Sequence, residues 1–132
     1  MTTLKVGIAS YEQMKARTLA VARGKQRARR DDPKIWFTSM ESFAKVLSDR
    51  NRALLAIIAE SQPDSLAELS ELSGRAKSNL SRTLRTMERY DLVQLRKGPG
   101  ATIVPRVPYS GITLAFPLRP VEQGPALKIV KR

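Results

Sequence analysis

The stretch of sequence that decides the fold is SLAELSELSGRAKSNLSRTLRTMERYDLVQLRKGPGATIVPR, residues 65–106. It predicts a helix, a short glycine turn, a second helix over residues 77–90, and a hairpin whose tip is Gly98-Pro99-Gly100. The second helix is apolar on one side and basic on the other. This order of elements is what a winged helix-turn-helix needs in order to place a helix in a DNA groove.

The first helix of this stretch has a clear start and one apolar side. Ser65 and Glu68 have the spacing of a capping box, so we expect them to cap the first turn reciprocally. Leu66, Leu69 and Leu72 follow at i, i+3 and i+6. They predict the side that packs against the second helix.

The second helix separates its apolar and polar residues. On a wheel of about 100° per residue, Leu80, Leu84 and Met87 fall within about 60° of one another and predict a buried stripe. The opposite side carries Ser78, Arg82, Arg85 and Arg89, and the stripe is flanked near the N-terminal end by Asn79 and Ser81.

The polar residue types suit contact with DNA. Arginine can bridge guanine O6 and N7 and asparagine can bridge adenine N6 and N7, so Arg82 and Asn79 are candidate base readers. Arg85 and Arg89 lie further along and are better placed for phosphates. The alternative is an amphipathic helix with an ordinary solvated basic side. Helix, turn, basic side and hairpin taken together favour DNA.

The predicted hairpin carries two cations, Arg96 and Lys97, beside its tight turn. Their position suits contact with the DNA backbone or the minor groove. A plain hairpin without a DNA contact is an equally good interpretation of this segment alone.

Composition favours a polyanionic partner. The chain has 132 residues, 42% of them hydrophobic, with 24 Lys and Arg against 12 Asp and Glu and a net charge of +12. This predicts one domain with appendages and a nucleic-acid partner. No apolar run has the length of a membrane span and the N-terminus lacks a signal-peptide core, so we expect a cytoplasmic protein.

The residue types exclude several kinds of chemistry. The chain contains no cysteine and no histidine, which removes disulfides, thiolate catalysis, Ser-His triads and Cys/His zinc sites. It has no phosphate loop of the G-x-x-x-x-G-K form and no evident carboxylate pair with metal-ligand spacing. We therefore expect no enzymatic activity, no cofactor and no metal.

The flanks extend the predicted fold to an α+β chain: a winged helix-turn-helix with an N-terminal strand-helix-strand extension and a C-terminal strand. We divide it into residues 1–38, 39–107, 108–118 and a flexible basic tail, 119–132. In the extension, Ser10 and Gln13 predict the start of a helix at Tyr11. The expected elements of the flanks and the scaffold are strands over 4–8, 35–38 and 112–116 and helices over 40–47 and 49–60.

The three flanking strands alternate apolar residues that need burial. They could pair across a two-fold axis, which would space two recognition helices for adjacent half-sites and make the extension a dimerisation element. A single sheet within one chain is the more economical alternative for any one strand. Dimerisation in some form is expected, because one small winged helix offers little specificity.

Two charged segments remain open. Residues 23–30 could form a basic arm for a minor groove through Arg23, Lys25, Arg27, Arg29 and Arg30, although a solvated loop is the simpler interpretation. The tail Pro120–Arg132 holds a small apolar patch among basic residues. Such a patch could occupy a toxin, and a disordered tail is the commoner case.

Residues 65–98 resemble the winged helix-turn-helix of MarR- and ArsR-like bacterial and archaeal regulators. Residues 1–118 further resemble a small prokaryotic family of winged-helix DNA-binding proteins, through LKVGIASYEQMKARTLAVARG, PKIWFTS and VPYSGITL. Some members sit beside toxin-like proteins as antitoxins. This chain departs from the pattern at Ala76, where a Ser or Thr cap is usual, and at Asp91, where Gly is usual.

The resemblance implies DNA contacts by the start of the second helix, including Lys77. The complete set of candidate DNA-binding residues is Lys77, Ser78, Asn79, Ser81, Arg82, Arg85, Arg89, Arg96 and Lys97. The expected function is a homodimeric, sequence-specific regulator of transcription, a repressor or autorepressor that binds double-stranded DNA. The alternative is an antitoxin that also neutralises a toxin protein.

Overall fold

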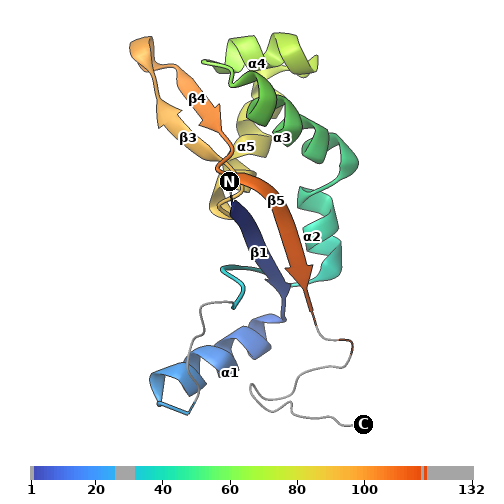
Figure 1. Ribbon diagram of the computed structural model, residues 1–132, viewed down its shortest axis with the longest axis vertical. Coiled ribbons are helices and arrows are strands. Elements are labelled where there is room, and N and C mark those ends of the chain that lie inside the picture. Colours follow the sequence, from blue (N-terminus) through green and yellow to red (C-terminus); the bar gives the residue numbers. More distant parts are fainter. Residues whose placement is uncertain (1, 26–31, 117, 119–132) are drawn as a thin grey trace. The chain divides into compact units, whose positions relative to one another are not determined.

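The computed structural model describes residues 2–25, 32–116 and 118, which form an α+β chain with five α-helices and two sheets (Figure 1). The elements in order are β1 (Thr2–Ile8), α1 (Tyr11–Ala22), β2 (Ile35–Phe37), α2 (Met40–Val46), α3 (Asp49–Ser61), α4 (Leu66–Ser73), α5 (Lys77–Arg89), β3 (Gln94–Lys97), a 3-10 turn (Pro99–Ala101), β4 (Ile103–Arg106) and β5 (Tyr109–Ala115).

The chain divides into two compact units, which we describe separately. The helical unit contains residues 44–111 together with the start of β1, and the sheet unit contains the described residues within 4–43 and 112–118. No helix among the described residues has both the length and the apolar character needed to cross a bilayer.

The sheet unit is built on three strands in the order β2-β1-β5. β1 runs parallel to β2, with Val6 opposite Ile35 and Ile8 opposite Phe37. Val6 and Phe37 are fully buried. Because both neighbours of β1 belong to the same chain, the three predicted strands form a single sheet, and β1 has no edge left for pairing across a two-fold axis.

Helix α1 begins where its sequence predicts. The Ser10 hydroxyl accepts a hydrogen bond from the Gln13 backbone N–H at 3.1 Å, and the Ser10 N–H donates to Gln13 Oε1 at 2.8 Å. None of its residues is buried. Its Arg17 pairs with Asp32 at 2.5 Å and lies 5.8 Å from the centre of the Trp36 ring.

The helical unit contains α3, α4 and α5 followed by an antiparallel hairpin, an arrangement consistent with a winged helix (Figure 1). Its core gathers apolar side chains of all three helices and of the residues before the hairpin. The buried members are Leu54 and Ile58 of α3, Leu69 of α4, Leu80, Leu84 and Met87 of α5, and Leu92 and Val93.

Two details of α4 correct the sequence interpretation. The Ser65 hydroxyl accepts from the Glu68 N–H at 3.0 Å, but the Glu68 carboxylate accepts from the Asp64 N–H at 3.0 Å, so the cap is not reciprocal. Leu72 is 46% exposed and does not belong to the packing side. The reason is rotation: i+6 lies about 120° from the first residue of the stripe, so the stripe leaves the interface after Leu69.

The end of α5 explains how Asp91 replaces the usual glycine. The Leu92 N–H donates to the Met87 carbonyl and the Asp91 N–H donates to the Glu88 carbonyl, both at 3.0 Å. These are the two bonds of a Schellman motif, which requires a residue with left-handed backbone conformation directly after the C-cap of the helix. Asp91 takes this conformation with φ 59°, so the substitution leaves the helix end intact.

The sequence predicts hairpin strands over residues 92–97 and 103–107, and the first of them is shorter in the structure. Leu92 and Val93 are buried in the core, and the ladder begins with Gln94 opposite Arg106 and ends with Lys97 opposite Ile103. Arg106 anchors the base of the hairpin, because its guanidinium donates to the Pro63 carbonyl at 2.7 Å and to Asp64 at 3.2 Å.

Candidate nucleic-acid interface

The predicted DNA-binding residues all lie on α5 and β3 of the helical unit. On α5 the apolar stripe is buried, and the remaining surface faces solvent. The exposed members of the predicted set are Lys77, Ser78, Arg82, Arg85, Arg89, Arg96 and Lys97, while Asn79 and Ser81 are partly buried. We call the six exposed cations of this set the basic surface: Lys77, Arg82, Arg85, Arg89, Arg96 and Lys97.

The charges of the basic surface are not neutralised within the described part of the chain. Arg85 donates to the Ser81 hydroxyl at 3.4 Å, and Arg89 donates to the Thr86 hydroxyl at 3.3 Å. Arg96 donates to Gln94 Oε1 at 2.7 Å. These partners are neutral, and the ion pairs among the described residues involve other arginines. The basic surface therefore keeps its positive charge for an external anion.

Sequence reasoning missed Arg75, which stands in the turn before α5. Its Nε donates to Asn79 Oδ1 at 2.9 Å, its Nη1 to Asn51 Oδ1 at 3.1 Å, and its Nη2 to the Thr83 hydroxyl at 3.2 Å. The residue therefore joins the N-terminal half of α5 to the first turn of α3. Its position next to the helix start was the available signal, but Asn51 lies 24 residues away and no periodicity links the two.

The Arg75 guanidinium is partly buried by these contacts. Burial, and secondarily the nearby charge of Arg50, hold the pKa of Arg75 below its ordinary value. An arginine nevertheless remains protonated in proteins, so all of its N–H groups act as donors. The contact also means that Asn79, a predicted base reader, already uses its carbonyl oxygen inside the protein.

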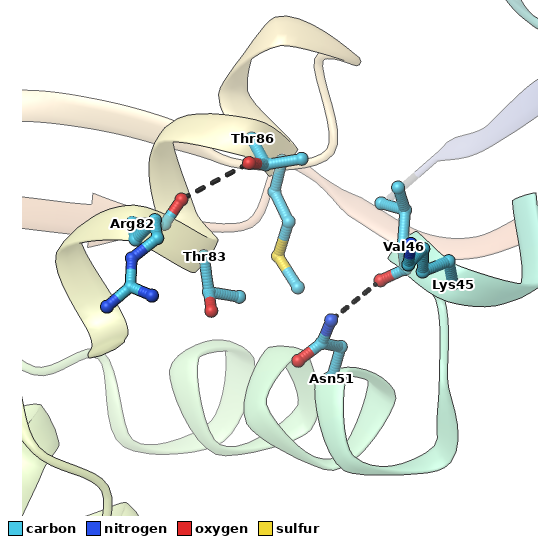
Figure 2. A pocket seen from close by; sticks show the side chains of 7 residues that line it. Lys45, Val46, Asn51, Arg82, Thr83 and Thr86 are labelled. Atoms are coloured by element: carbon cyan, nitrogen blue, oxygen red, sulfur yellow. Dashed lines mark hydrogen bonds between the residues drawn. The ribbon is translucent and has the colours of Figure 1, made fainter. Parts of the chain in front are cut away.

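A pocket of about 260 Å³ lies between α5 and residues of α2 and α3. Its lining combines two cations with amide, hydroxyl and apolar groups from α2, α3 and α5: Lys45, Val46, Asn51, Arg82, Thr83, Thr86 and Met87. Figure 2 shows the Asn51 side chain directed at the Val46 carbonyl, to which its Nδ2 donates at 3.0 Å. The Thr86 hydroxyl donates to the Arg82 carbonyl at 3.2 Å.

Other predicted segments contribute little to this surface. Of the basic arm, Arg23 and Lys25 are exposed, whereas Arg27, Arg29 and Arg30 lie outside the described residues. The tail 119–132 also lies outside them. Among the described residues, no group of three carboxylates is arranged to hold a metal ion.

Comparison with protein families matches the HVO_A0114 family over residues 46–114, just over half of the chain. The chain belongs to the HVO_A0114 family. The matched residues contain α3, α4, α5 and the hairpin, so the family match and the basic surface coincide in the sequence.

The comparison with solved structures gives a distant match for this HVO_A0114 protein. A structure described as "Crystal structure of the predicted DNA-binding transcriptional regulator from E. coli" is 20% identical with a TM-score of 0.45, and the match covers 53% of this chain and 74% of that one. Comparison with curated proteins gives no match.

Proposed function

We propose that this protein is a sequence-specific regulator of transcription that reads double-stranded DNA with α5. The observation that carries the proposal is the basic surface: α5 buries one side in the core and presents uncompensated cations on the other. A surface helix of a helix-turn-helix with these two sides is the element that enters a major groove.

The dimensions of α5 suit this task. With its side chains an α-helix is about 10–12 Å across, which matches the width of about 12 Å of the major groove, and the 13 residues of α5 span about 20 Å along it. Arg82 is exposed on the side opposite the buried stripe and has the donors for guanine O6 and N7. Lys77, Arg85 and Arg89 are suited to phosphates, and Arg96 and Lys97 extend the positive charge onto the hairpin.

We further propose that two copies act together, as a homodimeric repressor on paired half-sites. One helix of this size contacts few base pairs, and specific binding in a genome needs more discrimination than they provide. A dimer that occupies a promoter would block it without any catalytic step, which agrees with a chain that lacks histidine and cysteine.

The test begins with selection of sequences from a random double-stranded pool, followed by gel-shift titration of the selected site. Arg82→Ala should lose the preference for that site over random DNA, at a cost of about 1–3 kcal/mol for one bidentate contact. Arg52→Ala is the control, because Arg52 is exposed on α3 and pairs with Asp49. If Arg82→Ala discriminates as the parent does, the assignment of α5 as the reading helix is wrong.

The antitoxin alternative stays a prediction of the sequence. It depends on a tail that lies outside the described residues, and on a resemblance rather than on a described contact. Co-purification with the product of a neighbouring gene would support it.

A further inference from the structure

We propose that Arg75 fixes the orientation of the Asn79 amide, with Oδ1 turned toward Arg75 and the Nδ2 donors presented to DNA. Asn79 then donates to an acceptor on a base edge, and guanine, with two acceptors in the major groove, matches it best. It does not bridge adenine, although the sequence alone suggests that pairing. The inference rests on the proposed function and adds to it a positioning residue and a base preference.

The direction of each hydrogen bond follows from chemistry, beginning at a backbone carbonyl. The Val46 carbonyl can only accept, so the amide group that meets it at 3.0 Å is Asn51 Nδ2 (Figure 2). This turns Asn51 Oδ1 toward Arg75 Nη1, 3.1 Å away. The amide orientation of Asn51 is thereby determined from both ends.

Arg75 in turn determines the orientation of the Asn79 amide on α5. A guanidinium has five N–H donors and no acceptor, so the Asn79 atom 2.9 Å from Arg75 Nε is the oxygen. The second terminal nitrogen, Nη2, donates to the Thr83 hydroxyl at 3.2 Å and fixes the plane of the group. Arg75 is thus held by acceptors from α3 and α5 at once, a planar fork that lysine cannot reproduce.

The backbone of Arg75 is also held in place. Its carbonyl accepts a hydrogen bond from the Ser70 hydroxyl at 2.7 Å, and its N–H donates to the Ser73 hydroxyl at 3.2 Å. The guanidinium therefore starts from a fixed point in the turn.

The consequence appears at the Asn79 nitrogen. Within the part of the chain that the structure describes, no group accepts a hydrogen bond from Asn79 Nδ2, and the residue is only partly buried. Bidentate reading of adenine requires Oδ1 to accept from the adenine N6 amino group while Nδ2 donates to N7. Arg75 holds Oδ1 toward the turn and away from the position that this bidentate pairing needs, so the side chain presents its Nδ2 donors. Guanine offers them two acceptors, N7 and O6, in the major groove.

The first experiment uses the parent protein and base analogues in its selected site. At the position where Asn79→Ala loses discrimination, replacing guanine by 7-deazaguanine should weaken binding about tenfold in the parent and leave Asn79→Ala unaffected. The proposal is overturned if the selected site carries adenine at that position and the affinity of the protein falls when this adenine loses its N6 amino group. Retention of binding without that amino group would support it.

The second experiment separates positioning from stability. Arg75→Met keeps the length of the side chain and removes its donors, so the Asn79 amide can rotate and the preference at that one position should broaden to include adenine. Arg106→Met is the matched control, because Arg106 anchors the hairpin in the same unit and does not contact Asn79. A purely structural loss lowers binding to all sequences in parallel and leaves the base preference unchanged.

The outcomes distinguish this proposal from the proposed function. If the parent selects no sequence and binds no duplex, the proposed function fails and this inference fails with it. If the parent binds a specific site but Arg75→Met keeps the parent preference, only the role of Arg75 is wrong. Should Arg75→Met not fold, Asn51→Ala interrupts the same chain of hydrogen bonds, and the base analogues test the unmodified protein.

Discussion

The salt dependence of DNA binding can be worked out from the basic surface. Of its six cations, Arg82 is assigned to a base, which leaves five for phosphates. Each neutralised phosphate contributes a slope of about −0.9 to log K against log salt, so five contacts give about −4.5 for one chain. Between about 50 and 200 mM salt, the affinity of one chain should then fall about 500-fold.

One substitution tests this magnitude. Arg89→Gln removes a phosphate contact, so it should make the slope shallower by about 0.9 and weaken selected and random DNA alike. Arg52→Gln makes the same charge change outside the basic surface, at a residue already paired with Asp49, and should leave the slope unchanged. The measurement is a fluorescence anisotropy titration of a labelled duplex over a series of salt concentrations.

Either of two results would contradict the assignment of the basic surface to DNA phosphates. A parent slope shallower than about −2 would mean that most of the basic surface does not meet phosphate. An Arg89→Gln slope equal to that of the parent, together with a changed slope for Arg52→Gln, would place the DNA on another part of the helical unit.

Three further predictions concern the free energy of unfolding, measured by denaturant titration. Ala76→Ser supplies the side-chain cap that α5 lacks and should raise it by about 1 kcal/mol; no gain would mean that the first turn is already satisfied. Asp91→Gly keeps the left-handed backbone without a Cβ and should also raise it by about 1 kcal/mol; a loss would show that the Asp side chain holds the turn. Leu84→Ala should lower it by about 2–5 kcal/mol because Leu84 is 1% exposed. Leu72→Ala, at a position 46% exposed, should change it by less than about 0.5 kcal/mol, and equal losses would contradict the buried side assigned to the helices.

The parts of the fold that sequence predicts best are those set by neighbours in the chain. Ser10 and Gln13 interact over three residues, and they specify the start of α1 as expected. Leu80, Leu84 and Met87 share one side of a helix by periodicity alone, and all three are buried. Helical geometry is fixed over such distances, so spacing in the sequence translates directly into position.

Prediction fails where a residue depends on a distant partner or on the limits of an interface. Arg75 looks like a solvated turn residue until α3 brings Asn51 to within 3.1 Å of it. Leu72 continues the leucine spacing correctly, but the surface it would cover ends one turn earlier. The orientation of the Asn79 amide follows from Arg75, whose own position depends on Asn51, 24 residues away, so the sequence near Asn79 does not predict it.

The ends of α5 bear on what this helix is for. Helices α1, α3 and α4 each begin with a serine cap and an acidic residue in the first turn. α5 has neither, since Ala76 provides no cap and Lys77 places a positive charge at the positive end of the helix dipole, an unfavourable interaction of about 0.3–1 kcal/mol. Its stability must therefore come from the buried stripe. An external anion at this end would accept hydrogen bonds from the uncapped N–H groups and offset the charge of the lysine. Local rules of helix stability are typically broken in this way where an element serves a partner, and a polyanion such as the DNA proposed above has the charge that these residues fit.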